Sequence, residues 1–452
     1  MIASIEPERC RSLNDVSQRN GDYVLYWMQS SHRTEENPAL RCAVERADRA
    51  HLPLTVYFGL WQSYPDSNLR HFRFMLEGLA EVARSLEALG IRFVLRMEGP
   101  DRGVLALAKN AAVMVVDRGY LRLQRSWYRD VAERCRCPLL QVEGNVVVPV
   151  DAASQKEDYS AATFRPKITR HLDRFLNPVE TVAPQRSSLA LALPTLAGET
   201  TDALLSRLAV DRTVPASNLF TGGTTEANKR FEQFLQTRLE GFADNRNDPG
   251  GDGGSEMSPY LHYGQVSPVR LAVLAREHGG RGTPAFLEEL VVRRELAANF
   301  VRYNDNYDTI SSLPAWAQTT LARHRADPRE YMYSLDELER AATHDPFWNA
   351  AQQEMTKTGK MQGYMRMYWG KKILEWSSTP EEAYAAALYL NNRYEIDGRD
   401  PSGYAGVAWC FGKHDRPWGE RPVFGMVRYM NARGLERKFA MDRYVEKVGQ
   451  AR

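Results

Sequence analysis

The sequence DPFWNAAQQEMTKTGKMQGYMRMYWGKKILEW, residues 345–376, decides how the second half of the chain is interpreted. It opens with Asp345-Pro346, an N-cap residue followed by a proline at the first helical position, and it contains no further proline. The stretch is therefore predicted to be helical. Aromatic and apolar residues recur at spacings of three and four, which places Trp369 and Trp376 on one face, about 10.5 Å apart along the axis.

This aromatic face has two interpretations. Large aromatic side chains are usually buried for packing, which would make the face part of a core. A row of tryptophans that also includes Trp348 can alternatively pass an electron between a buried redox cofactor and solvent. Taken alone, the stretch favours packing.

Length and composition set limits on the remainder. At 452 residues two domains are expected, and 43% hydrophobic with 26% charged residues is typical of a soluble globular protein. The formal net charge is only +2, but residues 399–452 hold 11 Lys and Arg against 6 Asp and Glu, interleaved with aromatic residues. Such a mixture suits a polyanion that offers bases for stacking, and a solvated surface explains the charge equally well.

The five cysteines are few, odd in number and unsuitably spaced for a disulfide framework. The pair Cys135 and Cys137 lacks the further ligands that a zinc site needs, so reduced thiols and no metal site are expected. The polar N-terminus has no apolar h-region, and no run of residues reaches membrane-spanning length. These features predict a cytoplasmic protein, or a nuclear one in a eukaryote.

Strand and helix signals alternate over residues 1–150. Strands are predicted at 22–29, 52–60, 91–97, 112–116 and 139–142, with helical patterns at 38–50, 68–89, 103–109 and 121–133 between them. The alternation predicts an α/β domain with a doubly wound, Rossmann-like parallel sheet. No G-x-G-x-x-G or Walker sequence is present. Polar residues 28–33 and 117–119 follow two strands where open sheets bind ligands, although polar turns without a ligand are commoner.

The sequence pattern changes at residue 151 and again at residue 216. Residues 151–215 are rich in Ser, Ala, Thr and Pro and are expected to form an interdomain linker across the surface. In residues 216–452, Ser-Pro or Thr-Pro pairs begin at positions 258, 267, 283 and 379, and each predicts a helix start. This second domain is therefore predicted to be all-α.

Two polar stretches of the second domain are candidate ligand sites. Residues 249–259 place a glycine-rich loop directly before a helix start, which can cradle a phosphate or can simply be a flexible connection. Glu256 argues against a phosphate unless its carboxylate turns outward. Residues 390–401 carry carboxamides and carboxylates that could contact a flavin and a ribose, with Arg366 as an ion-pair partner, or could form a solvated loop.

These residues lie within longer motifs. MQGYMRMYWGKKILEW (361–376), LNNRYEIDGRDPSGY (390–404), HDRPWGERPVFGMVRYMN (414–431) and SPYLHYGQVSP (258–268) together resemble class II cyclobutane pyrimidine dimer (CPD) photolyases of the photolyase and cryptochrome superfamily. TFRPK and EELVVRREL agree with this group, and the resemblance covers nearly the whole chain from Tyr23 onwards.

The resemblance implies an N-terminal domain that can hold an antenna chromophore, with an 8-hydroxy-5-deazaflavin type favoured over a folate or an empty site, and a C-terminal domain that holds FAD. It implies a light-driven lyase that passes an electron from reduced FAD to a dimer flipped out of DNA; photolyases are among the standard examples of such base flipping. A monomer without an obligate protein partner is expected. The alternatives are a cryptochrome-like photoreceptor without repair activity and a flavin-free helical DNA-binding module.

The resemblance also assigns individual residues. Glu295 would hydrogen-bond the dimer's base and stabilise the charge that the dimer gains, because a strong hydrogen bond near a carbonyl favours the radical anion. Met367 would touch the lesion, and Asn391 would face the reactive edge of the flavin. The electron relay would comprise Trp369 nearest the flavin, Trp348, and Trp376 at the surface. The remaining assignments are Gly254, Ser255, Glu256, Met257, Ser258, Arg366, Asp397 and Asp400, with Asn391, for FAD, and Arg246, Asn247, Trp409, Arg416, Arg421 and Arg428 for DNA.

Overall fold

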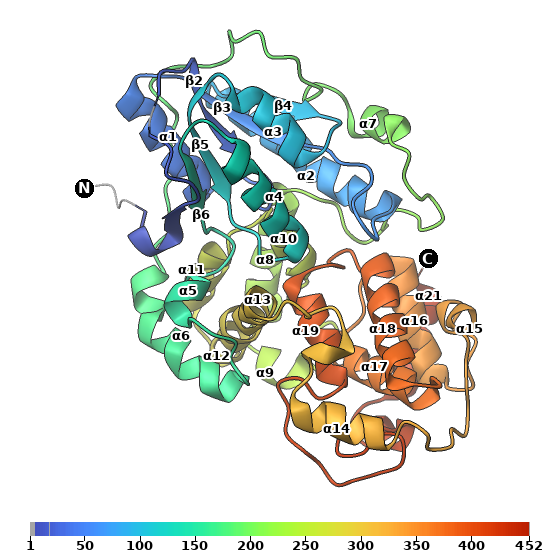
Figure 1. Ribbon diagram of the computed structural model, residues 1–452. Helices are drawn as coiled ribbons and strands as arrows, with labels where there is room; N and C mark the ends of the chain where they lie inside the picture. The colour runs from blue at the N-terminus through green and yellow to red at the C-terminus, as the bar shows by residue number, and fades with distance from the viewer. Residues whose placement is uncertain (1–4, 18, 452) are drawn as a thin grey trace.

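The computed structural model describes residues 5–17 and 19–451, which form a sheet domain beside a helical body (Figure 1). The strands are β1 (Cys10–Ser12), β2 (Tyr23–Trp27), β3 (Leu54–Gly59), β4 (Arg92–Arg96), β5 (Ala111–Asp117) and β6 (Leu139–Val142). Their order in the sheet is β1-β6-β5-β2-β3-β4, and every neighbouring pair is parallel except β1 with β6. The five predicted strands are confirmed. The antiparallel edge strand β1 was missed because three residues carry no periodic signal.

Alternating side chains of the strands supply the two faces of the sheet. Val24, Tyr26 and Met28 join the core beneath α1 (Pro38–Ala50) and α2 (Leu69–Ala88). Tyr23, Leu25 and Trp27 belong to the opposite core, beneath α3 (Pro100–Ala108) and α4 (Arg122–Arg134). Since the strand order reverses at β2, the residues after β2 and β5 meet in the crevice where such sheets bind ligands. The predicted doubly wound α/β fold is therefore confirmed.

The segment 151–215 is more structured than its composition suggested. It contains α6 (Ala161–Phe175) and α7 (Thr201–Arg207) and follows the short helix α5 (Val150–Ala153). Phe164 and Ile168 of α6 are buried in a core of the helical body. The prediction of an irregular connection is thus wrong for α6, where Pro166 inside the helix misled the sequence interpretation. The domain boundaries themselves remain predictions.

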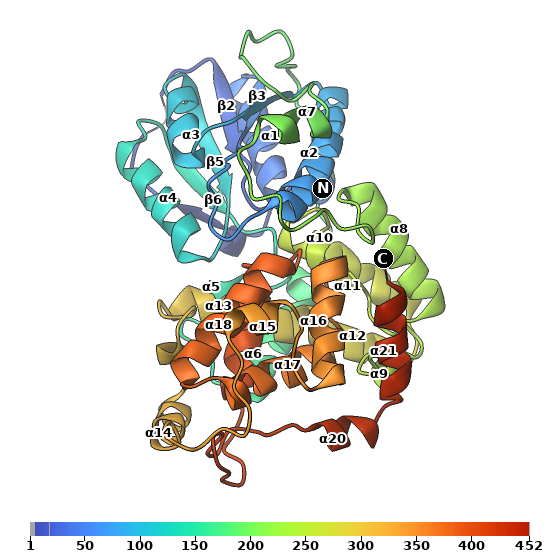
Figure 2. The same ribbon diagram turned by 90° about the vertical axis from the view of Figure 1, so that its right-hand side faces the viewer.

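The helical body contains two hydrophobic cores and lies below the sheet domain in Figure 2. Its helices are α8 (Thr224–Thr237), α9 (Phe242–Asn245), α10 (Ser258–His262), α11 (Pro268–His278), α12 (Thr283–Leu287), the π-helical turn η2 (Glu288–Arg293), α13 (Arg294–Tyr303), α14 (Ala315–Arg323), α15 (Leu335–Glu339), α16 (Pro346–Thr358), α17 (Gly363–Trp376), α18 (Pro380–Tyr394), α19 (Pro401–Cys410), α20 (Ala432–Glu436) and α21 (Met441–Gln450), with short 3-10 turns at Pro7–Arg9 and Ile310–Ser312. The predicted all-α second domain is confirmed.

The stretch 345–376 is two helices rather than one. Gly359 adopts a left-handed conformation with φ of 84° and ends α16, and Gln362 then caps α17. Helix α18 differs in the opposite sense, because it continues to Tyr394 through residues that were expected to form a loop. Both corrections move polar residues of the predicted site onto rigid helix ends.

The two domains are joined through buried side chains. The guanidinium of Arg70, on α2, donates to the carbonyl oxygens of Met355 and Thr356 at the end of α16, and to that of Tyr394 at the end of α18. These bonds satisfy carbonyls that a helix end leaves without partners. Within residues 5–17 and 19–451, no helix combines the length and apolarity that crossing a membrane requires.

Candidate functional site: a cavity in the helical body and an aromatic path beside it

A cavity of about 280 Å³ opens among α10, η2, α13 and α19. The sequence predicted six of the residues that line it, and they come from three separate segments of the chain. They are Ser255, Met257, Ser258, Asp397, Asp400 and Trp409. Residues distant in sequence but predicted to share a ligand are thus brought together at one concave surface, as a binding site requires.

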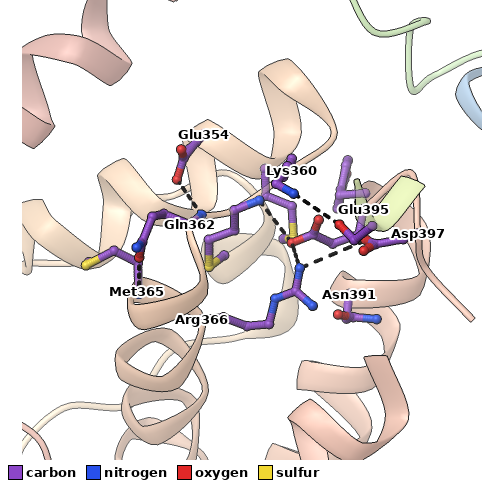
Figure 3. A network of polar contacts seen from close by, with 12 residues as sticks. Glu354, Lys360, Gln362, Met365, Arg366, Asn391, Glu395 and Asp397 are labelled. Carbon is purple, nitrogen blue, oxygen red and sulfur yellow. Dashed lines mark hydrogen bonds and ion pairs between the residues drawn. The ribbon is translucent and has the colours of Figure 1, made fainter. Parts of the chain in front are cut away.

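Arg366 stands at the centre of a buried polar network beside this cavity (Figure 3). Its Nη2 lies 2.8 Å from Oε1 of Glu395 and 4.0 Å from Oδ1 of Asp397, so Glu395 is its closer partner. Burial raises the pKa of Glu395 to about 8, although the positive charge of Arg366 acts in the opposite direction. Asn391, which is also buried, lies next to this network in Figure 3. The prediction paired Arg366 with Asp397 and missed the buried glutamate between them.

Two buried atoms of this network have no partner. Neither Nε of Arg366 nor Oε2 of Glu395 makes a hydrogen bond to any described residue. Buried polar atoms are normally bonded, and exceptions indicate a partner supplied by a ligand or by water. One open donor and one open acceptor next to a carboxamide match the alternating donors and acceptors along the edge of a flavin ring. The residues present therefore fit an FAD molecule.

In the loop before α10, the negative charge of Glu256, which argued against a phosphate site, has an ion-pair partner. Glu256 has φ of 60°, and its carboxylate pairs with Arg230 at 3.1 Å, so that charge is neutralised by the helix α8 arginine. Ser255 and Ser258 line the cavity, whereas Gly254 is exposed. Lys360 was not predicted, yet its Nζ donates to Oγ of Ser258 at 3.0 Å and brings a positive charge to the loop.

Glu295 does not lie where the resemblance assigned it. Its side chain is completely buried, and its carboxylate accepts hydrogen bonds from the backbone amides of Val147, at 2.5 Å, and Val148, at 3.1 Å. It does not line the cavity. Burial raises its pKa to about 8 despite these two amides. A carboxylate held inside the joint with the sheet domain cannot contact a bound base, so the assignment is corrected.

Glu289, a glutamate six positions before Glu295, lines the cavity where Glu295 was expected. It lies in η2, lines the cavity, and pairs with Arg246 at 2.7 Å, with its side chain 37% exposed. Arg293 at the end of η2 lies over the ring of Trp409, 5.1 Å from the centroid. Sequence analysis missed Glu289 because the wider π turn shifts which residues share a face, a feature that recurs at functional sites.

Asp400 lines the cavity, whereas two further predicted residues, Met367 and Asn247, do not. Asp400 caps α19 by accepting from the amide of Ser402, and its other carboxylate oxygen lies 3.1 Å from Nδ1 of His262. The sulfur of Met367 is 3.9 Å from that of Cys410 at the end of α19. Asn247 is half-buried on the loop after α9, next to Arg246.

The three tryptophans of the predicted relay are close to one another in a second region. Trp369 donates from its indole nitrogen to Oε1 of Gln352 at 2.9 Å. Trp348 donates to the carbonyl of Trp369 at 3.0 Å, and its ring centroid is 5.6 Å from that of Trp376, at an interplanar angle of 67°. The contacts therefore connect Trp369 to Trp348 and Trp348 to Trp376. All three rings are part of the core, as the packing interpretation predicted, and the electron-relay interpretation stays a prediction.

The predicted surface end of this path is wrong. Trp376 is only 2% exposed, because Tyr333 and His344 cover it with ring centroids 5.3 Å away in each case. The resemblance had implied exposure, but the loop before α15 packs Tyr333 over the ring.

Arginines and aromatic rings also gather on the loop 411–431. The guanidinium carbons of Arg416 and Arg428 each lie 5.3 Å from the ring centroid of Trp418, which is 42% exposed. Arg421 lies 5.0 Å from the ring centroid of Tyr429. Among the described residues none of the three arginines has a carboxylate within 4 Å. Three unneutralised guanidinium groups beside an exposed indole form a surface suited to phosphates and bases.

A second cavity opens at the carboxyl edge of the sheet, where polar residues were predicted. Gln29, Ser30 and His32 line it after β2, together with aromatic side chains that include Trp61 and Trp127. Asp117 holds this edge together, since its carboxylate accepts from the amides of three residues that follow β2. The helical body contributes to this aromatic-lined cavity as well, because His262, Tyr263 and Arg399 line it.

The fold is shared with solved structures of low sequence identity. A class III photolyase from Agrobacterium tumefaciens superposes with a TM-score of 0.72 at 19% identity, covering 96% of this chain and 87% of that structure. A cryptochrome from Synechocystis superposes with a TM-score of 0.71 at 14% identity, covering 96% of this chain and all of that structure. The molecule thus has the fold of the photolyase and cryptochrome proteins.

Sequence comparison defines the family further. A family model described as DNA photolyase matches residues 24–185. A deoxyribodipyrimidine photo-lyase of Methanothermobacter thermautotrophicus is 54% identical over 98% of both chains, and one of Potorous tridactylus is 40% identical over 97% of this chain and 83% of that protein. The chain belongs to the DNA photolyase family, and membership implies FAD as its cofactor.

Proposed function

We propose that the protein repairs DNA by using light to split cyclobutane pyrimidine dimers. The observation that carries this proposal is one cavity whose lining includes Asp397, beside the buried polar network of Arg366 and Glu395, and also Glu289, Arg293 and Trp409. A cofactor and a damaged base would both find complementary partners along this lining. The full-length relatives named deoxyribodipyrimidine photo-lyase support the same activity.

Residues of the cavity floor would hold FAD. Arg366, Asp397 and Asn391 would bind the flavin edge, and Ser255, Ser258 and Lys360 would bind the diphosphate through hydroxyl and ammonium groups. When bound in its reduced state and illuminated, FAD supplies the electron that opens the cyclobutane ring.

Residues of the cavity mouth would hold the dimer. The carboxylate of Glu289 can accept the N3–H of a pyrimidine, and the guanidinium of Arg246 can donate to the neighbouring carbonyl and stabilise negative charge on the base. Trp409, with Arg293 stacked on it, offers a platform for an unstacked base. The arginines Arg416, Arg421 and Arg428 would contact the phosphates that flank the lesion.

Two further sites belong to the proposal. The path from Trp369 through Trp348 to Trp376 would carry electrons that reduce the cofactor. The cavity at the carboxyl edge of the sheet would hold the antenna, and the indole faces of Trp61 and Trp127 in its lining favour a planar chromophore of the 8-hydroxy-5-deazaflavin type.

The test combines a spectrum with a repair assay. The purified protein is expected to show FAD absorption and to restore dimer-containing DNA under blue light but not in darkness. Colourless protein would refute the cofactor assignment. Bound FAD with no light-dependent repair would refute the substrate assignment and would favour a photoreceptor. Size-exclusion chromatography with light scattering tests the expected monomer.

A further inference from the structure

The relay ends on a ring that does not reach water. Trp376 is covered by Tyr333, from the loop before α15, and by His344, from the turn before α16. The backbone amide of Tyr333 donates to the carbonyl of Trp376 at 3.3 Å, which fixes this loop over the indole. An electron that enters the relay from solvent must therefore cross the two covering residues.

The Tyr333 hydroxyl is held in a defined hydrogen-bond geometry. It lies 2.6 Å from Nδ1 of His344, and the backbone amide of His344 donates to the same hydroxyl oxygen at 3.0 Å. The amide donates to that oxygen, and when Nε2 carries the imidazole proton the phenol can donate its own proton to Nδ1. We assign Nδ1 as the acceptor and Nε2 as the protonated nitrogen on this basis. The phenol thus has a base at hydrogen-bond distance.

The same residues extend to the surface. The ring of Tyr331 stacks on that of His344 with a centroid separation of 3.8 Å and an interplanar angle of 21°. Tyr331 is 41% exposed, and His344 is exposed as well. Continuous ring contacts therefore lead from Trp348, through Trp376 and Tyr333, to a solvent-facing imidazole.

Charge disfavours an oxidised Trp376. The ammonium of Lys372 lies 5.6 Å from the centroid of the Trp376 ring, and a positive charge at this position opposes a second positive charge on the indole. Glu375 binds that ammonium at 2.5 Å and offsets part of the effect. Tyr333, by contrast, can lose an electron without becoming charged if its proton moves to His344 at the same time.

We propose that Tyr333 and His344 are the terminal electron donor of the relay, which rests on the tryptophan path of the proposed function. When Trp376 has lost one electron, Tyr333 returns one electron to it and passes its phenolic proton to Nδ1 of His344. Trp376 becomes neutral, and a neutral tyrosyl radical remains beside an imidazolium. A soluble thiolate then reduces the radical and becomes a thiyl radical, while the imidazolium returns the proton to the phenolic oxygen.

The experiment follows the radicals by time-resolved absorption and electron paramagnetic resonance after a flash on protein that contains oxidised FAD. In the unaltered protein a tryptophanyl signal is expected to give way to a tyrosyl signal, more slowly in D2O. Tyr333→Phe is expected to lose the tyrosyl signal and to prolong the tryptophanyl signal. His344→Gln is expected to slow tyrosyl formation. The matched control Tyr331→Phe keeps the stacked ring and is expected to behave as the unaltered protein.

The outcomes separate this inference from the relay itself. A tyrosyl signal that persists in Tyr333→Phe, or a tryptophanyl radical that decays in the unaltered protein without any tyrosyl signal, overturns the inference and leaves the relay standing. If the flash produces no tryptophanyl radical at all, the relay and this inference both fail.

A measurement in darkness needs no photochemistry. In protein labelled with 15N-histidine, the Nδ1 resonance of His344 is expected to have the position of a hydrogen-bonded acceptor and to shift in Tyr333→Phe but not in Tyr331→Phe. An unchanged resonance in Tyr333→Phe would show that the phenol does not bond to this nitrogen, which overturns the proton-transfer step.

Discussion

Two buried charged groups at the joint between the two domains, Glu295 and Arg70, are fully bonded, whereas two groups beside the cavity are not. At the joint, both carboxylate oxygens of Glu295 accept from backbone amides, and the guanidinium of Arg70 donates to several helix-end carbonyls. Beside the cavity, Nε of Arg366 and Oε2 of Glu395 lack a partner among the described residues. A saturated set stabilises the fold, whereas an open set awaits a ligand. The comparison distinguishes structural from functional residues where composition does not.

Two glutamates of one helical segment show the difference between structural and functional residues most clearly. Glu289 and Glu295 lie six positions apart in the same continuous helical segment and are the same residue type. Glu289 faces the cavity and pairs with Arg246, while Glu295 faces the sheet domain and is fully buried. Changes at the two positions should therefore affect different properties, repair for one and stability for the other.

The largest expected effect is that of Trp369→Phe, a buried residue that we assign to electron transfer rather than to packing alone. Photoreduction of oxidised FAD should be abolished, because phenylalanine is much harder to oxidise than the indole that begins the path to Trp348. Repair by chemically pre-reduced enzyme should remain close to normal. Absorption spectra recorded during illumination measure the first property, and dimer splitting measures the second.

A matched control for this change is Trp316→Phe, which alters a half-buried tryptophan outside the path that donates to Tyr159 instead. It should photoreduce normally. Normal photoreduction in Trp369→Phe would mean that electrons reach the cofactor by another path, and the assignment of all three tryptophans would fail with it.

Glu295→Ala should cost about 3 kcal/mol of the free energy of unfolding, because two buried amides lose their acceptors and a cavity is left. Urea unfolding at neutral pH measures the loss. The repair yield of the remaining folded, FAD-loaded protein should be unchanged. A normal stability with a reduced yield would restore Glu295 to the catalytic role that the resemblance gave it.

We also expect the unfolding free energy that is lost in Glu295→Ala to depend on pH. Burial raises the pKa of Glu295 to about 8 in the folded state, above its ordinary value of 4.5. A raised folded-state pKa stabilises the fold fully below the ordinary value, and this contribution is lost as the pH rises towards 8. The difference in unfolding free energy between the natural protein and Glu295→Ala should therefore shrink from pH 5 to pH 8.

Local patterns predicted most of the fold, because they report local causes. Alternating apolar runs gave the five long strands, and the Thr-Pro pair at Thr379 gave the start of α18. Gly359, which ends α16, was not recognised, since a glycine within an aromatic pattern does not reveal a left-handed conformation. Sequence alone does not show which domain a helical residue faces, so Glu295 was assigned to the cavity and Glu289 was missed.

A smaller effect is expected at the cavity mouth. Glu289→Ala should lower the affinity for dimer-containing DNA by about tenfold, the cost of one hydrogen bond to a charged group, and should release Arg246 from its ion pair. Titration of a fluorescent dimer-containing duplex measures the affinity. The unfolding free energy should change little, which is the reverse of the result expected for Glu295→Ala.

The control is Glu288→Ala, which removes a neighbouring carboxylate that pairs with Arg165 and Arg293 but does not line the cavity. If Glu288→Ala and Glu289→Ala weakened binding equally, general loss of negative charge on η2 would explain both results, and the contact with the base would be disproved.

The smallest effect is expected on the exposed loop. Arg416→Ala should reduce the affinity for dimer-containing and undamaged DNA alike, because a phosphate contact carries no information about the base. The slope of log affinity against log salt concentration should fall in magnitude by about 0.9, the value for one released counterion. The control Arg325→Ala removes an exposed arginine paired with Glu381 and should leave the slope unchanged. Equal slopes for all three proteins would place the DNA elsewhere, whereas a loss specific to damaged DNA would move Arg416 from the phosphates to the lesion.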